Sequence, residues 1–372
     1  MVLRTGAASR WRRLALGALV PLAAVFAVAC SSDDEAADAT AAATAAATTA
    51  AATAEATPES LEGQTLVVYS GRNEALIAPL LEQFSEATGV TIEAKYGSSS
   101  EMAATLLEEG SRSPADVFLA QDTGALGAVE QAGLFAPLDA SLLNLVPAEF
   151  RSNQGGWVGL SGRVRVIVYN KDAVAEADLP TSVKDVIDPK WQGRVGWAPT
   201  NASLQAFVTA FRLVEGDDAA RAWLQGMLDN GAVVYPNNGG VVQAVADGEV
   251  DLGLVNHYYL FGFLRDQGPD FPVANHYTAP GDIGSLVGVA GGGILKTAKS
   301  TAAAQALMAY MLSEEGQRYF SEQTFEYPVI ASVQPSADLP GLSSVTPPDL
   351  DLNDLSDLQG TIELMRSVGA LQ

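Results

Sequence analysis

The sequence is poor in cysteine, histidine and basic residues. Cys30 is the only cysteine among 372 residues, so the chain cannot form an internal disulfide. Its two histidines, His257 and His276, supply little for histidine acid–base catalysis or for a metal site of several imidazoles. Lys and Arg number 21 against 44 Asp and Glu, and the net charge of −23 argues against a nucleic-acid partner.

The signatures of common enzyme classes are also missing. The chain has no Gly-x-Ser-x-Gly elbow, no Gly-x-x-x-x-Gly-Lys-Ser/Thr loop, no His-Glu-x-x-His motif and no dinucleotide fingerprint after its first strand. We interpret the glycine-rich stretch 288–294, GVAGGGI, as a strand or hinge that passes close to another backbone. A secreted enzyme would need a nucleophile and a base in one cleft, and the sequence offers no candidates.

The N-terminus has the pattern of an export signal. Four arginines precede the apolar stretch LALGALVPLAAVFAVA, and the segment ends in AVAC. Pro21 interrupts this stretch, which is short for a transmembrane helix. We predict a signal peptide over residues 1–29, exported by the Sec or the twin-arginine route. Cys30 then stands as in a bacterial lipobox, where the thiol is lipidated.

Alanine and threonine dominate the segment after Cys30. Residues 31–60 have no large apolar side chain to bury, so the segment cannot offset its ordering entropy. An Ala-rich helix here would have nothing to pack against. We therefore predict a flexible linker over residues 30–62, attached to a lipid anchor.

From Leu61 onward, strand and helix patterns alternate along the chain. The predicted strands are 65–70, 90–96, 115–120, 162–170, 194–198, 232–236 and 250–255. The predicted helices are 74–89, 101–110, 203–214, 217–229, 301–322 and 359–370. This repetition predicts an α/β fold with a parallel sheet covered by helices on both faces. Two such lobes would leave a cleft for a small ligand and close around it by hinge motion.

Two tyrosines, Tyr258 and Tyr259, stand together between the predicted strand 250–255 and a further predicted helix that starts within residues 260–268. Neighbouring residues within a strand or a helix point in different directions, so two neighbours converge on one target only at such a junction. In open α/β sheets, ligands bind beyond the carboxyl ends of the strands. The pair is therefore either a ligand site or two packed rings.

The tyrosine hydroxyl groups are the polar groups at this junction that could bind a ligand. A tyrosine keeps its proton to about pH 10, so it ligates well only where a strong Lewis acid displaces that proton. Ferric ion is hard and triply charged, and it favours anionic oxygen donors. Three phenolates would neutralise it, and Tyr169 could be the third. Arg163 shares a strand face with Tyr169 but lies about 20 Å away in a straight strand, so both serve one site only if the chain bends.

An anion is the natural complement of such a metal site, because three protein ligands leave coordination positions unfilled. The segment 199–207, PTNASLQAF, predicts a helix start capped by Asn201 or Ser203, with free backbone N–H groups. This start either holds carbonate or phosphate or is an ordinary capped helix. The segment 235–240, YPNNGG, favours a turn, and a ligand-binding loop is the second interpretation.

Six segments carry a family resemblance: VVYSGRNEALIAPLLEQFSEATG, EEGSRSPADVF, LSGRVRVIVYN, WQGRVGWAPTNAS, VVQAVADGEVDLGLVNHYY and SEEGQRYFSEQTFEYPV. From about Thr65 to near the C-terminus, their order resembles the periplasmic ferric-ion-binding proteins, the solute receptors of bacterial iron ABC transporters. The resemblance implies an α/β, two-lobe periplasmic-binding-protein fold with a hinge and an interlobe cleft. We place the N-terminal lobe at 63–165 and 290–340, and the C-terminal lobe at 166–289 and 341–372.

The resemblance also implies a set of site residues. Fe(III) would be held by Tyr258 and Tyr259, with Tyr169 as the further phenolate of members that use more. Carbonate or bicarbonate, with phosphate as the alternative, would bind beside the iron. The residues implied for this anion are Arg72, Arg163, Asn201, Ala202, Ser203, Asn238 and Asn256. The two arginines could instead form surface ion pairs.

The first lobe departs from the family pattern. Asn73, followed by Glu74, stands where many members have a histidine ligand. Gln121, followed by Asp122, replaces a carboxylate ligand of some members. Glu74 and Asp122 are therefore the remaining candidates for a metal ligand from this lobe.

The resulting prediction is a lipoprotein receptor, not an enzyme, that captures Fe(III), closes and delivers it to an ABC permease. We expect a monomer in the periplasm or at the cell surface, anchored to the membrane through Cys30. A receptor of the same fold for an organic cation or an oxyanion stays open, and a secreted enzyme is the alternative from another class. Ferric phenolate absorbs visible light, whereas the other cargoes leave the protein colourless.

Overall fold

The computed structural model of the chain describes residues 60–371. The predicted signal peptide, Cys30 and nearly all of the predicted linker lie outside this range. No helix in the described part of the chain combines the length and the apolar character needed to span a membrane.

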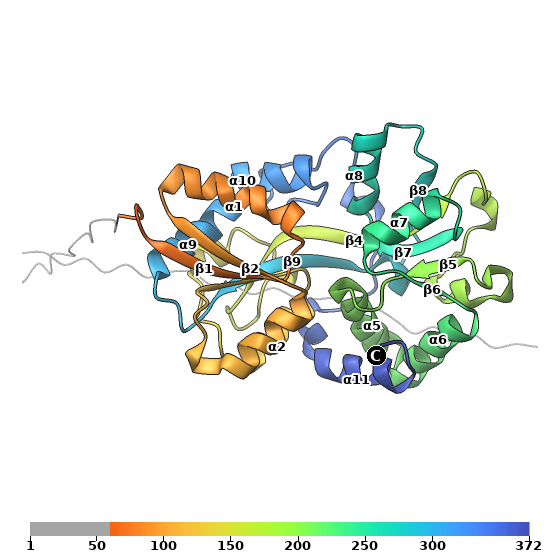
Figure 1. Ribbon diagram of the computed structural model, residues 1–372, viewed down its shortest axis with the longest axis horizontal. Coiled ribbons are helices and arrows are strands. Elements are labelled where there is room, and N and C mark those ends of the chain that lie inside the picture. Colours follow the sequence, from red (N-terminus) through yellow and green to blue (C-terminus); the bar gives the residue numbers. More distant parts are fainter. Residues whose placement is uncertain (1–59, 372) are drawn as a thin grey trace, which may run out of the picture. The chain divides into compact units, whose positions relative to one another are not determined.

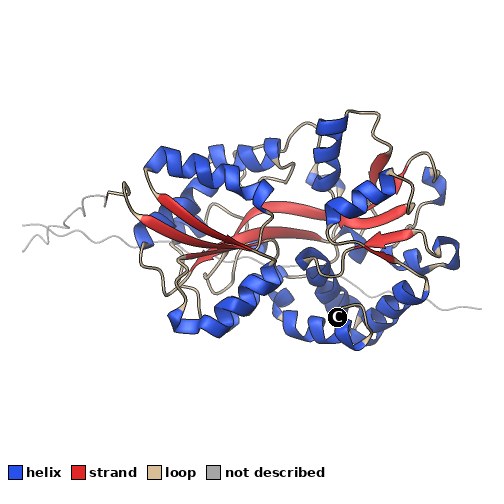
Figure 2. Ribbon diagram, in the orientation of Figure 1, coloured by secondary structure: helices blue, strands red, loops and turns tan. Residues whose placement is uncertain are grey.

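Within residues 60–371, nine strands form one hydrogen-bonded sheet, drawn in red in Figure 2. The strand order is β2-β1-β3-β9-β4-β7-β5-β6, and β8 pairs with β4 beside this path. The strands are β1 (Thr65–Ser70), β2 (Thr91–Tyr96), β3 (Val117–Ala120), β4 (Val158–Asn170), β5 (Val195–Trp197), β6 (Val233–Val234), β7 (Leu252–Asn256), β8 (Val273–His276) and β9 (Val287–Ile294).

Helices cover both faces of this sheet (Figure 1). They are α1 (Glu74–Thr88), α2 (Ser99–Glu109), α3 (Thr123–Gln131), α4 (Ala140–Leu143), α5 (Ala202–Glu215), α6 (Asp217–Asp229), α7 (Asn238–Ala246), α8 (Tyr258–Gln267), α9 (Thr301–Met311), α10 (Glu314–Arg318) and α11 (Leu358–Ser367). The predicted helices at 74–89, 101–110, 203–214, 217–229 and 359–370 correspond to α1, α2, α5, α6 and α11.

Two long strands, β4 and β9, run across the middle of the sheet and make it mixed (Figure 1). β1 is parallel to β2 and β3, and β5 is parallel to β6 and β7. β4 instead pairs antiparallel with β9 over residues 158–164, and antiparallel with β7 and β8 over 165–170. The predicted all-parallel sheet is therefore wrong at its centre. The prediction assumed that every strand returns through a helix, whereas these two strands pass directly between the halves.

The glycine-rich stretch 288–294 lies in β9, as interpreted from the sequence. A Cβ added at Gly291 would lie 2.6 Å from the carbonyl oxygen of Val158, and one at Gly293 would lie 2.5 Å from that of Gly156. Only glycine allows such a close approach of two backbones. The stretch therefore lets β9 cross tightly against β4.

The predicted helix 301–322 is broken in the structure. α9 ends at Met311, and the Ser313 side chain accepts a hydrogen bond from the N–H of Gly316 to start α10. A π-helical turn, Tyr319–Gln323, follows. The apolar pattern of the segment continues across this break, but the serine cap ends the hydrogen-bond ladder and restarts it.

Aromatic packing fixes the position of α5. Phe207 and Phe211 of this helix each lie 5.5 Å from the ring of Trp223 in α6. Each such aromatic pair contributes about 0.5–1.5 kcal/mol beyond its buried area. This packing holds the N-terminus of α5, at Asn201, at one wall of the cavity described next.

Candidate metal and anion site

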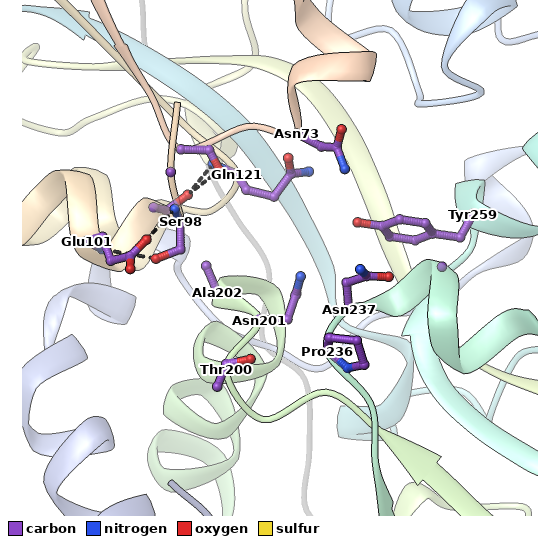
Figure 3. Close-up of a pocket in the computed structure, with 14 residues that line it drawn as sticks. Asn73, Ser98, Glu101, Gln121, Thr200, Asn201, Ala202, Pro236, Asn237 and Tyr259 are labelled. Carbon is purple, nitrogen blue, oxygen red and sulfur yellow. Dashed lines mark hydrogen bonds between the residues drawn. The ribbon is translucent and has the colours of Figure 1, made fainter. Parts of the chain in front are cut away.

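A cavity of about 440 Å³ lies between the two halves of the described chain (Figure 3). Its lining from the first half is Gly71, Asn73, Gly97, Ser98, Ser99, Glu101 and Gln121. Its lining from the second half is Thr200, Asn201, Ala202, Pro236, Asn237, Gly239 and Tyr259. The cavity is therefore an interlobe cleft, as the sequence predicts.

The tyrosine pair stands at the wall of this cleft. β7 ends at Asn256 and α8 begins at Tyr258, which confirms the predicted strand-to-helix junction. The two rings stack with their centroids 4.5 Å apart and an angle of 28° between their planes. Tyr258 is only 2% exposed, and Tyr259 faces the cavity. Adjacent residues thus present both phenols to one place.

Burial keeps both phenols protonated. It raises the pKa of Tyr258 well above its ordinary value, and the neighbouring Tyr259 raises it further. Burial also raises the pKa of Tyr259, although hydrogen bonds to Tyr258 and Asn238 oppose that rise. A cation strong enough to displace these protons would gain two anionic oxygen ligands side by side.

His257 fixes the backbone just before the pair. Its ring is fully buried, and burial lowers its pKa to about 4, so the ring is neutral. Its Nδ1 accepts a hydrogen bond from the N–H of Val164 (3.1 Å), so Nε2 carries the proton and donates to the carbonyl of Phe325 (2.9 Å). His257 is therefore a packed, hydrogen-bonded residue of the core.

Gln121, at the end of β3, reaches the tyrosines from the opposite lobe. Its Nε2 donates a hydrogen bond to Oη of Tyr258 over 3.0 Å, and both side chains are buried. The sequence marks Gln121 only as a replaced carboxylate, so this contact was missed. Asn73 also lines the cleft, where its side chain caps α1.

The two carboxylates predicted for this lobe do not line the cleft. Glu74 is exposed in the first turn of α1. Asp122 is buried, and its Oδ1 accepts a hydrogen bond from the N–H of Ala125 to cap α3. Burial raises the pKa of Asp122 even though Arg163 opposes the shift. Both carboxylates therefore have local roles at helix starts.

The predicted anion-holding residues at the start of α5 do meet at the cleft. Asn201 and Ala202 line the cavity, and Asn201 Oδ1 accepts hydrogen bonds from the Ser203 N–H (3.0 Å) and from Asn238 Nδ2 (3.4 Å). Asn256 Nδ2 donates to Ser203 Oγ over 3.1 Å. These amides form a connected network between α5, α7 and the tyrosine pair.

Several helices begin at this cavity. Its lining includes the capping residues of α1, α2, α5 and α7, which are Asn73, Ser98, Asn201 and Asn237. Helix N-termini carry partial positive charge and free N–H groups. The cleft therefore favours an anion although no cationic side chain lines it within residues 60–371.

Arg72 forms an ion pair and does not line the cleft. Its Nη2 lies 2.5 Å from Glu326 Oε2, with both side chains fully buried, and its Nη1 donates to Ser161. The predicted role of Arg72 as an anion holder is therefore not supported, and the alternative of a surface ion pair is wrong in one respect, because this ion pair is buried. Glu326, its partner, was missed by the sequence analysis.

Arg163 and Tyr169 lie at different places along β4. Arg163 pairs with Gly288 of β9, whereas Tyr169 pairs with Leu252 of β7 and with β8. The Tyr169 hydroxyl lies 3.5 Å from Glu176, and the residue does not line the cleft. β4 is one continuous strand from Val158 to Asn170, so Arg163 and Tyr169 stay six positions apart along it. The structure therefore does not bring Tyr169 to the tyrosine pair.

Comparisons with known proteins identify the family. The family model of bacterial extracellular solute-binding proteins matches residues 80–343. An Fe(3+)-binding periplasmic protein of Serratia marcescens is 34% identical over 310 residues, which cover 83% of this chain and 91% of the relative. This chain therefore belongs to the periplasmic ferric-ion-binding protein family. The resemblance inferred from the six segments is confirmed.

Other relatives and solved structures agree. The major ferric iron-binding protein of Neisseria meningitidis serogroup B is 32% identical, covering 82% of this chain and 92% of the relative. The crystal structure of iron-bound HitA from Pseudomonas aeruginosa superposes with a TM-score of 0.79 at 35% identity, covering 82% of this chain and 99% of HitA. A Trichodesmium protein in complex with iron and citrate gives a TM-score of 0.68 at 30% identity, with the same coverage. The predicted two-lobe fold is confirmed.

Proposed function

We propose that this protein is an extracytoplasmic receptor that binds Fe(III) through Tyr258 and Tyr259 and delivers it to an ABC permease. The observation that carries the proposal is the stacked tyrosine pair, with Tyr258 buried and Tyr259 partly buried at the wall of an interlobe cleft. Among residues 60–371, no three His, Cys, Asp or Glu side chains gather as a metal site. The relatives named for ferric-ion binding support the choice of cargo.

Ferric ion suits this pair by its chemistry. It is a hard, triply charged Lewis acid that favours anionic oxygen, and it is strong enough to displace a phenol proton. We leave Tyr169, Glu74 and Asp122 out of the ligand set because the Tyr169 hydroxyl lies near Glu176, Glu74 is exposed on α1 and Asp122 caps α3. Two phenolates from one lobe then leave coordination positions for other ligands.

We propose that an anion fills those positions, with carbonate or bicarbonate first and phosphate as the alternative. Its binding site would be the start of α5, at Asn201 and Ala202, because these residues line the cleft at a helix N-terminus, which favours anions. Asn238 would hold Asn201 in place through its hydrogen bond. Asn73 and Gln121 would contact the bound complex from the other lobe through neutral amides.

The membership in a solute-binding family implies an ABC permease as partner. We further propose a monomer that acts in transport and not as an enzyme. The membrane anchor would be a lipid on Cys30, with residues 30–62 as linker between the anchor and the lobes. The lobe boundaries predicted from the sequence stay part of this proposal. β4 exchanges β9 for β7 between Val164 and Arg165, next to the boundary placed after residue 165.

Titration with ferric citrate, with and without bicarbonate, tests this function. Wild-type protein is expected to develop a visible phenolate-to-iron absorption band, and bicarbonate is expected to strengthen it. Tyr258→Phe and Tyr259→Phe should each weaken the band and the binding by orders of magnitude. Tyr169→Phe is the matched control and should leave both unchanged. A colourless protein that still binds an organic cation or an oxyanion would favour the alternative cargo.

A further inference from the structure

His257 is held by hydrogen bonds from three separate segments of the chain. Its backbone N–H donates to the carbonyl oxygen of Val164 over 3.0 Å, and its own carbonyl oxygen accepts a bond from Nδ2 of Asn275 over 2.9 Å. Its ring forms two more bonds, from the N–H of Val164 to Nδ1 and from Nε2 to the carbonyl of Phe325. Four bonds thus fix the single residue that lies between β7 and Tyr258.

The bonds to Val164 complete the sheet where α8 begins. Arg165 pairs with Asn256, so the next antiparallel pair would be Val164 with His257. At His257 the backbone already has helical φ and ψ values of −54° and −38°. The ring Nδ1 takes the place of the backbone carbonyl as acceptor for the buried Val164 N–H. Val164 is also the last residue of β4 that pairs with β9, so this bond lies where β4 passes between the halves.

The bond to Phe325 reaches a strained part of the backbone. Phe325 has a φ of 56°, and it is the only non-glycine residue of the described chain with a positive φ. A bulky residue keeps such a conformation only where its surroundings enforce it. Its ring stacks on Phe261 of α8, with the ring centroids 5.5 Å apart, and its carbonyl oxygen accepts the Nε2 bond of His257. The position of Phe325 is therefore set together with that of α8.

The residues after Phe325 connect it to the first half of the chain. Glu326 forms the buried ion pair with Arg72, which follows β1. Tyr327 exchanges two backbone hydrogen bonds with β4, of 2.7 and 2.9 Å. A continuous series of contacts thus runs from Arg72 through these residues to His257 and the tyrosine pair.

The direction of the phenols depends on the backbone that carries them. Tyr258 follows His257 directly, and its ring stands at 89° to the imidazole with the ring centroids 5.7 Å apart. Both ring nitrogens of His257 are used in hydrogen bonds, so it is not itself a ligand. We propose that His257 is a positioning residue, which holds the phenols toward the cleft through its hydrogen bond to Phe325. This inference rests on the proposed iron function and adds to it a residue that does not touch the metal.

Two amide substitutions separate the bond to Phe325 from the bond to Val164. In His257→Asn, the amide oxygen lies near the position of Nδ1 and can accept the Val164 N–H, but the shorter side chain does not reach Phe325. In His257→Gln, the amide nitrogen lies near the position of Nε2 and can donate to Phe325. His276→Asn is the matched control, because Nε2 of His276 also donates to a backbone carbonyl, that of Pro180 (2.7 Å), and His276 does not line the cleft.

Phe325→Gly changes the other end of the same bond. Glycine adopts a φ of 56° without strain, so the carbonyl acceptor is kept but a packed ring no longer fixes its direction. We expect iron release from this variant to be faster than from wild type. The variant keeps the proposal testable where His257→Asn does not fold.

The first test loads each folded variant with ferric citrate and measures the visible band and the rate of iron release to a chelator. Loss of one buried hydrogen bond predicts about tenfold faster release from His257→Asn, together with a shifted band maximum, which a loss of stability alone would not give. His257→Gln should stay close to wild type in both, and His276→Asn should match it. A wild-type band and release rate in His257→Asn and Phe325→Gly, or an equal change in His276→Asn, would overturn the proposal.

The second test needs no iron. Crystal structures of the iron-free wild type, His257→Asn and His257→Gln are compared at the tyrosine pair. We expect Oη of Tyr258 to leave hydrogen-bond distance of Gln121 Nε2 in His257→Asn and to stay there in His257→Gln. An unmoved Tyr258 in His257→Asn would overturn the proposal. A moved Tyr258 in a protein that binds no iron would contradict the proposed function and leave the positioning role in place.

Discussion

Iron binding to the tyrosine pair should release protons, because both phenols are protonated at neutral pH. Burial raises the pKa of Tyr258 and of Tyr259 above the ordinary value. Only the phenolate oxygen is a strong ligand, so each tyrosine that binds Fe(III) loses one proton. The protein is therefore predicted to release two protons per iron from this pair.

The size of the effect follows from that count. Below the phenol pKa values, two released protons make the iron affinity rise about a hundredfold per pH unit, or about 2.7 kcal/mol. Tyr259→Phe removes one of the two protons and should reduce the slope to about tenfold per pH unit. Tyr169→Phe should keep the full slope, because its hydroxyl lies near Glu176 outside the cleft.

Proton release can be measured directly in a weakly buffered solution with an indicator dye. Ferric citrate is added between about pH 6.5 and 7.5, where the phenols are protonated. Citrate and bicarbonate also exchange protons, so the informative quantity is the difference between wild type and each variant. The expected difference is one proton per iron for Tyr259→Phe and none for Tyr169→Phe. Equal release by wild type and Tyr259→Phe would refute the reasoning.

Three other predictions concern buried groups. Glu326→Gln leaves a fully buried guanidinium without its carboxylate and should lower the unfolding free energy by about 3–5 kcal/mol in urea denaturation. A loss within experimental error would contradict this. Gln121→Glu places a carboxylate where Nε2 now lies 3.0 Å from the Tyr258 hydroxyl, and it should strengthen iron binding without bicarbonate by about tenfold in chelator competition. Unchanged binding would argue against a ligand position there. Burial lowers the pKa of His257 to about 4 from 6.5, so the unfolded chain takes up a proton that the folded chain does not. Stability should be full above pH 6.5 and fall by about 3 kcal/mol as the pH drops toward 4, compared with His257→Gln in urea. Identical pH profiles would contradict this assignment.

Local patterns were enough to predict the parts of the site that depend on adjacent residues. The strand before Tyr258 and the helix after it each have their own apolar periodicity, so the junction follows from the sequence. The same holds for the start of α5, where Asn201 is a favourable cap before an apolar helical face. These features need no knowledge of which distant segments meet.

Long-range pairings left no comparable signal. Arg72 and Glu326 are 254 positions apart, and nothing near either residue marks it as the partner of the other. Tyr169 shows a related limit, because the alternation of side chains along a strand gives the face of a residue but not the course of the strand. Parity places Arg163 and Tyr169 on one strand face, but only the pairing of β4 shows that the strand stays extended between them. The antiparallel course of β4 and β9 was missed for the same reason.

The central claim is that two adjacent phenolates hold the iron at the cleft wall. A crystal structure of the iron-loaded protein tests this most directly. The account predicts that Oη of Tyr258 and Oη of Tyr259 both coordinate the metal, with an anion between the metal and the start of α5. An iron ion bound elsewhere, with both hydroxyl groups free of it, would contradict the account.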